Sequence, residues 1–178
     1  MSESAAHHRR ATWAEYERLP VDVRHEYIDG EIVVTPFPTP RHSWAIFGLQ
    51  AALHGMLPDD LMPVSHTGWR AGADEFGPDL MVIPRSAVDG VRFEGIPPLV
   101  VEVVSSNRAD DTVRKVQKYA RAGAPRYWIV DLRDRTLLAL VLVEGIYEVA
   151  AQLDDDNPVV DLDTGSGPVT VSLPDLLG

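Results

Sequence analysis

The chain of 178 residues contains no cysteine. Disulfide bonds, thiolate catalysis and cysteine-based zinc sites are therefore excluded. Long apolar runs are also missing, since none approaches the roughly 18 residues that span a bilayer. The opening segment, MSESAAHHRR, lacks the apolar stretch of a secretory signal. We therefore expect a cytoplasmic protein without a membrane-spanning segment.

An excess of basic residues is missing as well, because the net charge is −11. Attraction to phosphate needs a basic surface, so this charge argues against a protein that coats nucleic acid. The acidic excess is uneven. Residues 41–126 hold ten basic and ten acidic side chains, whereas the chain from 127 onward holds ten acidic side chains against two arginines. We expect any anionic ligand to meet the middle of the chain.

The chain does contain enough apolar sequence for one core. Hydrophobic residues make up 45% of a chain whose length suits one domain better than two. Internal repeats and long linkers are not visible in the sequence. We predict a flexible tail over residues 1–10 and a single domain over residues 11–178.

The first half of the chain carries clear local signals. Thr12 followed by Glu15 forms a capping box that opens a short helix. The dipeptide Asp29-Gly30 predicts a hairpin between strands near 24–28 and 31–35. A helix over about 41–56 follows, with His42 at its first turn on the apolar face. The other residues of that face are Ala45, Ile46, Leu49, Leu53 and Met56.

The second half predicts a mixed sheet. A very apolar strand over 99–104 precedes a helix over about 109–122, which Gly123 and Pro125 terminate. Such a strand–helix–strand unit over 99–131 places two parallel strands in one sheet. Further strands are expected near 136–143, 145–151 and 168–172. The predicted class is α/β (α+β), with a mixed central sheet flanked by helices and an antiparallel C-terminal extension.

Glu102 interrupts the apolar strand over 99–104. A carboxylate in a buried central strand is costly unless it is paired or bound to a metal ion. Strand alternation places it on the same face as Val100 and Val104. Two interpretations stay open: a functional acid, or a glutamate that pairs with an arginine in the core or at a sheet edge.

Asp79 opens another strand directly after Pro78, so it is either a functional acid or a turn residue. If its strand neighbours that of Glu102, the two carboxylates can approach within ~4 Å, where their repulsion is about 4 kcal/mol at an effective dielectric of about 20. A bound cation or a shared proton must offset that repulsion. Ligands that are all oxygen select Mg²⁺ or Mn²⁺ rather than zinc.

Lys115 lies at the margin of the face that the helix over 109–122 is expected to bury. Because it neighbours Tyr119, it can reach inward. The alternative is a solvated lysine paired with Asp111, one turn earlier. The expected buried residues are Val113, Val116, Tyr119 and Ala120, and the expected solvent-facing residues are Arg114, Lys118 and Arg121.

Two further residues are weaker candidates. Glu31 follows the Asp-Gly turn and is a possible third acid facing the cleft. His42 could orient a ligand or a carboxylate, although a histidine at such a position is often only a structural group. Glu26 is expected at the surface or in hairpin pairing.

Several short strings of this sequence, in order over roughly residues 11–150, resemble the Uma2 family. Its members are restriction-endonuclease-like proteins of the PD-(D/E)XK nuclease superfamily. The strings are Glu26-Tyr27-Ile28-Asp29-Gly30-Glu31, Pro40-Arg41-His42, Pro78-Asp79-Leu80, residues 97–103, Asp111…Lys115…Tyr119, and residues 123–131.

The resemblance implies roles for three residues. Asp79 matches the aspartate of the PD element, and Glu102 matches the acid of the (D/E)XK element. The lysine that the superfamily places two residues after this acid is Val104 here, so Lys115 on the following helix is expected to take over. With the main-chain carbonyl of Val103, the two acids would hold Mg²⁺ or Mn²⁺.

The predicted function is that of a metal-dependent endonuclease that hydrolyses phosphodiester bonds in DNA. The alternative is a catalytically inactive nuclease fold retained as a binding or assembly module. The acidic charge and Val104 favour this alternative, while RNA stays open as a substrate. For assembly we expect a homodimer, and no membrane partner.

Overall fold

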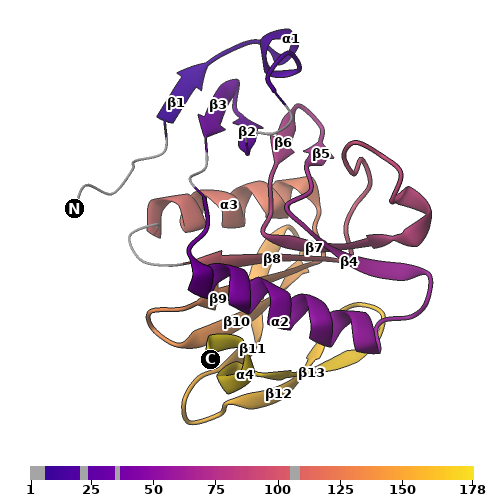
Figure 1. Ribbon diagram of the computed structural model, residues 1–178, viewed down its shortest axis with the longest axis vertical. Helices are drawn as coiled ribbons and strands as arrows, with labels where there is room; N and C mark the ends of the chain where they lie inside the picture. The colour runs from indigo at the N-terminus through magenta and orange to yellow at the C-terminus, as the bar shows by residue number, and fades with distance from the viewer. Residues whose placement is uncertain (1–6, 21–23, 35–36, 105–108) are drawn as a thin grey trace.

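The computed structural model describes residues 7–20, 24–34, 37–104 and 109–178. The helices and strands of the chain are labelled in Figure 1. Their bounds are β1 (His7–Arg10), α1 (Trp13–Tyr16), β2 (His25–Ile28), β3 (Glu31–Val34), α2 (Pro40–Met56), β4 (Leu61–Ser65), β5 (Trp69–Ala71), β6 (Asp74–Phe76), β7 (Leu80–Pro84), the 3₁₀ turn η1 (Arg85–Ala87), β8 (Leu99–Val104), α3 (Ala109–Ala122), β9 (Arg126–Asp131), β10 (Thr136–Val143), β11 (Ile146–Leu153), β12 (Val159–Asp163), β13 (Pro168–Ser172) and α4 (Leu173–Leu177).

The largest sheet has the strand order β11-β10-β9-β8-β7-β4. Within it β8 and β9 pair in parallel, with α3 connecting them, and the other neighbouring strands pair antiparallel. Helices lie against it in Figure 1, and the hairpin β12-β13 and α4 follow as a C-terminal extension. The predicted class, a mixed sheet flanked by helices, is confirmed.

A second sheet has the order β1-β3-β2-β6-β5 and lies at the upper end of the molecule in Figure 1. Its strand β1 pairs with β3 from His7 opposite Val34 to Arg10 opposite Glu31. The flexible tail predicted over residues 1–10 is therefore wrong for His7–Arg10, and its other residues lie outside those described.

The hairpin between β2 and β3 follows from its turn. Asp29 and Gly30 both have positive φ, 55° and 79°, which is the geometry of the two-residue turns that match the twist of paired strands. The turn sets Glu26 opposite Val33. Because β2 also pairs with β6, the face that carries Glu26 turns toward the core rather than toward solvent.

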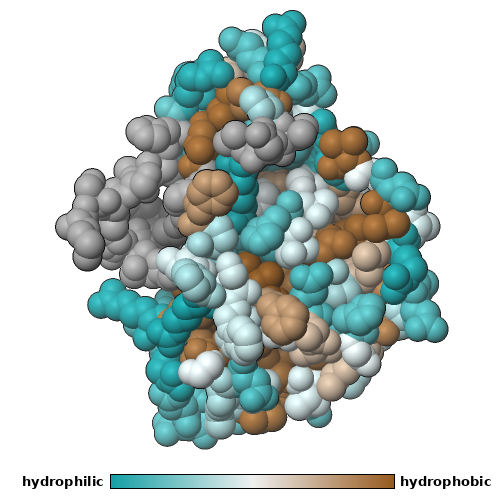
Figure 2. Space-filling model, viewed as in Figure 1, coloured by the Kyte–Doolittle hydropathy of each residue, from teal (hydrophilic) through white to brown (hydrophobic). Residues whose placement is uncertain are grey.

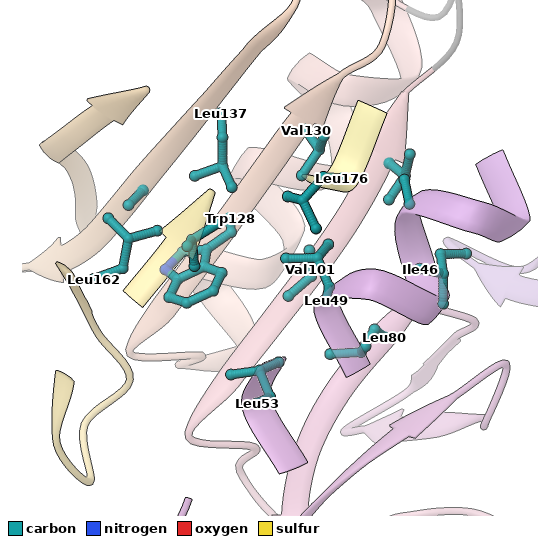
Figure 3. Packing of buried hydrophobic residues seen from close by; sticks show 14 of the residues in the cluster. Ile46, Leu49, Leu53, Leu80, Val101, Trp128, Val130, Leu137, Leu162 and Leu176 are labelled. Carbon is teal, nitrogen blue, oxygen red and sulfur yellow. The ribbon is translucent and has the colours of Figure 1, made fainter. Parts of the chain in front are cut away.

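One face of the largest sheet packs on α2. This helix begins at Pro40, with the Thr39 side chain accepting a hydrogen bond from the His42 N–H. Its buried residues include Ile46 and Leu49, which belong to one buried cluster with Val101 and Trp128 of the sheet. Leu49 lies beside Val101 in Figure 3. The prediction that Met56 belongs to this buried face is wrong, because Met56 lies in the last turn of α2 and is 51% exposed.

The opposite face of the sheet packs on α3, with Val100 and Tyr127 against Tyr119. The rings of Tyr119 and Tyr127 meet edge to face at 5.1 Å. The buried face of α3 passes through Lys115 and Tyr119, four residues apart, and not through Val113, which is 60% exposed. The prediction for Val113 is therefore wrong, because the helix is turned so that Lys115 faces the sheet.

The surface combines polar side chains with a few exposed aromatic ones. Figure 2 shows brown and tan patches between teal side chains on the face that carries α2. On α2 itself, Trp44 and Phe47 are 55% and 64% exposed. Over the described residues, no helix is long and apolar enough to cross a membrane.

Candidate active site

Three carboxylates and one ammonium group are buried together on the α3 side of the sheet. They are Glu26 from β2, Asp79 from the residue before β7, Glu102 from β8 and Lys115 from α3. All four residues are less than 9% exposed. Charged groups are rarely buried unless they are paired, so their mutual contacts define the chemistry of this site.

The position of Asp79 follows from strand register. Since β7 pairs with β8 from Leu80 opposite Val101, the side chain of Asp79 extends along β8 beyond the last paired residues. There its Oδ2 accepts a hydrogen bond of 2.9 Å from the Val103 N–H. The Asp79 carboxylate thus accepts the hydrogen bond that a backbone carbonyl of β7 would otherwise accept. This bond holds the carboxylate next to β8.

Two basic side chains complete the environment of Asp79. Arg24 Nη2 donates to Oδ1 at 2.8 Å, and His42 Nε2 lies 3.1 Å from Oδ2. Burial alone would raise the pKa of this carboxyl. The hydrogen bond from His42 and the charges of Arg24 and Lys115 outweigh burial and hold the pKa well below its usual range, so Asp79 is ionised.

The pKa of Glu102 is shifted in the opposite direction to that of Asp79. Its Oε1 accepts hydrogen bonds from Lys115 Nζ at 2.9 Å and from the Tyr119 hydroxyl at 2.6 Å. Burial raises the pKa of Glu102 to about 7; the Lys115 charge opposes this, while the charges of Asp79 and Glu26 add to it. The carboxyl therefore titrates near neutral pH.

Lys115 connects the acids through a continuous network. Its Nζ lies 3.3 Å from Glu26 Oε1, the same oxygen that accepts the Gly77 N–H at 2.8 Å. The Gly77 carbonyl in turn accepts from Arg24 at 2.7 Å. Each of the three carboxylates thus forms an ion pair with at least one basic side chain.

The structure brings most of the predicted residues together. Asp79, Glu102, Lys115 and His42 lie in this network, and the Val103 backbone joins it through its N–H. Lys115 is 6% exposed, so the alternative of a solvated lysine is wrong; the side chain of its proposed partner Asp111 lies outside those described.

Glu31 lies apart from this group. It belongs to β3, and its carboxylate pairs with His8 at 3.4 Å and with Arg10 at 3.8 Å. Its side chain is 30% exposed. The structure thus gives Glu31 a pairing role between β1 and β3, rather than placing it beside Asp79 and Glu102.

Glu26, Arg24 and Tyr119 are members of the site that the sequence reasoning missed. The surface position expected for Glu26 is wrong, since the residue is 3% exposed. A signal was present: in a strand, Glu26 shares a face with Ile28, which is fully apolar. Arg24 lies one strand step further along that face, and Tyr119 one helical turn beyond Lys115.

The residues present fit a divalent cation held mainly by oxygen. Over the described residues, no three His, Cys, Asp or Glu side chains are grouped as metal ligands. Asp79 and Glu102 nevertheless supply two buried carboxylates whose charges interact. The Val103 N–H points to Asp79, and the carbonyl of a strand residue points to the same side as its N–H, which adds a third oxygen. Hard cations such as Mg²⁺ take this donor set.

The fold is that of a nuclease-like α+β protein. It is similar to a crystal structure described as "a putative nuclease belonging to DUF820" from Anabaena variabilis, with a TM-score of 0.76 and 18% sequence identity over 93% of this chain and 97% of that chain. The model of the family Uma2, described as "Putative restriction endonuclease", matches residues 13–167. The chain therefore belongs to the Uma2 family. Comparison with curated proteins finds no match.

Proposed function

We propose that this protein is a Mg²⁺-dependent endonuclease that hydrolyses phosphodiester bonds in DNA. The observation that carries the proposal is the convergence of Asp79, Glu102 and Lys115 in one buried network. Burying three charged groups costs free energy, and a stable fold does not need it. Family membership and the nuclease-like fold support the same conclusion.

Asp79 and Glu102, with the Val103 carbonyl, would hold Mg²⁺ or Mn²⁺. When bound, such an ion supplies positive charge that activates water and neutralises phosphoryl oxygens. His42 fixes the orientation of Asp79, and Tyr119 fixes that of Glu102. Both carboxylates are therefore held in place before substrate arrives, which is a general requirement of efficient sites.

Lys115 supplies the positively charged side chain that Val104 cannot supply. Its Nζ contacts Glu102 and Glu26, so the ammonium group is fixed at the acids by two carboxylates. From there it would orient the attacking water and stabilise the negative charge that develops on the phosphoryl oxygens. A lysine on α3 would thus take the role that the superfamily pattern gives to a lysine on the strand.

The test is cleavage of plasmid and oligonucleotide DNA with Mg²⁺ or Mn²⁺. We expect Asp79→Asn, Glu102→Gln and Lys115→Met each to lower the rate at least about 100-fold, since each removes one of the groups that stabilise transition-state charge. These near-isosteric changes keep the core filled. Arg121→Ala, on the exposed side of the same helix, is the control. Cleavage that survives in one variant would remove that residue from the mechanism.

A second candidate function is a binding or assembly module without turnover, acting as a homodimer. Two observations favour it: Val104 stands where a lysine is expected, and both acids already carry a basic partner, Arg24 on Asp79 and Lys115 on Glu102. Titration calorimetry with Mn²⁺ separates the two candidates. Binding that is lost in Asp79→Asn supports the enzyme, whereas no binding at millimolar ion supports the module.

A further inference from the structure

A cavity of about 660 Å³ opens directly beside the acidic network. Arg24 and Gly77 form its wall on that side, and both belong to the network, since Arg24 donates to Asp79 and to the Gly77 carbonyl. A group bound in the cavity would therefore lie next to Asp79. The volume is within the range of roughly 300–1,000 Å³ typical of small-molecule sites, and a nucleobase fits in such a space.

His66 marks the boundary between the cavity and the network. It follows β4, whose last residue Ser65 pairs with Leu80, so His66 lies across from Asp79 and donates its N–H to the Asp79 carbonyl at 3.3 Å. Its φ is +54°, a conformation that non-glycine residues adopt rarely. The backbone is thus held in an uncommon conformation at the point where the cavity meets the acids.

The outer part of the cavity is lined by apolar side chains that are unusually exposed. Phe37 is 96% exposed, Val91 is 84% exposed and Val88 is 48% exposed. Phe93 and Ile83, both buried, lie deeper in the lining. An exposed aromatic ring beside other apolar side chains of the cavity is suited to stacking on a flat ring system, and proteins commonly hold unpaired bases by stacking them on aromatic side chains.

The charges of the cavity do not suit a duplex. Its two arginines are both neutralised, Arg24 by Asp79 at 2.8 Å and Arg92 by Glu75 at 2.6 Å. Glu17 adds a negative charge to the lining. Binding to duplex DNA requires a row of basic groups along the phosphates. A single strand depends less on phosphate neutralisation than a duplex does, and its unpaired bases can also stack on aromatic side chains.

We infer that this cavity receives one unpaired base of a DNA strand, stacked on Phe37, with the adjoining phosphate directed at Asp79 and Glu102. This inference rests on the proposed nuclease function and gives it a substrate class: single-stranded or locally unpaired DNA rather than intact duplex. An acidic nuclease would then obtain its affinity from base stacking, and not from a basic surface.

The test measures binding without metal, so that cleavage does not interfere. A fluorescein-labelled DNA oligonucleotide of mixed sequence is titrated in EDTA, as a single strand and annealed to its complement, and fluorescence anisotropy is followed. We expect the single strand to bind at least about tenfold more tightly than the duplex. Phe37→Ala should weaken single-strand binding about tenfold, and Phe37→Trp should retain it.

Phe47→Ala is the matched control, because Phe47 is also an exposed phenylalanine but lies on α2 outside the cavity. Both phenylalanines are largely exposed, so neither change endangers the fold. Equal effects of the two substitutions, or duplex binding as tight as that of the single strand, would overturn the inference. Equal binding of the RNA version of the oligonucleotide would overturn the assignment to DNA.

Failure of this inference and failure of the proposed function give different results. Single-strand binding that depends on Phe37, without cleavage in any divalent metal, would leave the base site standing and remove the nuclease proposal. Metal-dependent cleavage of duplex DNA that Phe37→Ala does not change would leave the nuclease standing and remove the base site.

Discussion

At the scale of single residues, the two central acids have opposite electrostatic environments. Asp79 accepts hydrogen bonds from Arg24, His42 and the Val103 N–H, and its pKa lies below the usual range. Burial raises the pKa of Glu102 to about 7. One carboxylate is thus permanently charged, while the other changes its charge near neutral pH. Such divergence between neighbouring acids is typical of functional sites.

The raised pKa of Glu102 predicts how stability changes with pH. A carboxyl with a pKa of about 7 when folded and 4.5 in the unfolded chain stabilises the fold fully below pH 4.5 and loses that contribution as the pH rises through 7. The melting temperature of the wild type should therefore fall relative to that of Glu102→Gln between pH 5 and pH 8. Thermal unfolding in EDTA, with exposed Glu148→Gln as the control, measures this.

The reverse trend would contradict this prediction. If the wild type gains stability over Glu102→Gln as the pH rises, the charged form of Glu102 is favoured in the folded protein. In that case the charge of Lys115, which lowers the pKa of Glu102, would outweigh the effect of burial, which raises it.

The sequence predicts the central residues of the site better than their partners. Asp79 and Glu102 stand out because a carboxylate beside or inside an apolar strand has a cost that demands an explanation. Arg24 and Glu26 do not, because charged residues near a hairpin are ordinary at the surface. The pairing of β2 with β6, a contact between segments far apart in sequence, accompanies the contacts of both residues with Gly77.

At the scale of elements, turns and caps are local and were predicted correctly. The Thr12–Glu15 capping box is present, with both of its hydrogen bonds. The Asp29-Gly30 hairpin is present as well. By contrast, β1 and β12 were not predicted, since each is stabilised by its partner strand, β3 or β13, rather than by a pattern of its own. The rotation of α3 is a tertiary property, which explains the error at Val113.

Replacing Gly30 or Gly55 by alanine is expected to change the free energy of unfolding in opposite directions. Gly30 has a φ of +79°, so alanine there is strained, while Gly55 lies in α2 with open space around it. We expect Gly30→Ala to destabilise the fold by about 1 kcal/mol, and Gly55→Ala to stabilise it by about 0.5–1 kcal/mol. Urea unfolding of both variants measures the difference. A Gly30→Ala variant as stable as the wild type would show that the turn geometry at Gly30 does not require glycine.

At the scale of the whole molecule, the C-terminal extension completes the core on the α2 side. Leu162, Val169 and Leu176 belong to the same buried cluster as Leu49 and the sheet. The fit between α4 and α2 is close: a Cβ on Gly48 would lie 3.1 Å from a methyl group of Leu176. The extension is therefore a part of the packed structure, and not an appendage.

Leu176 tests that role. Leu176→Ala should lower the free energy of unfolding by about 2–4 kcal/mol, because a fully packed leucine leaves a cavity when it is truncated. Ile146→Ala, at a site that is 70% exposed, should change it by less than about 0.5 kcal/mol. Chemical unfolding followed by tryptophan fluorescence compares the two. Similar small effects would mean that the extension packs loosely on α2.

The uneven distribution of charge along the sequence is also an uneven distribution over the molecule. The acidic residues after position 127 include Asp161 and Asp163 of β12 and Asp175 of α4. Both elements lie at the end of the molecule opposite β1 and α1 (Figure 1). A polyanion that diffuses toward this protein is repelled most strongly at that end, and repulsion reduces unproductive encounters there. We expect an approaching polyanion to meet the molecule more often at the neutral stretch of residues 41–126, which includes α3, than at this acidic end.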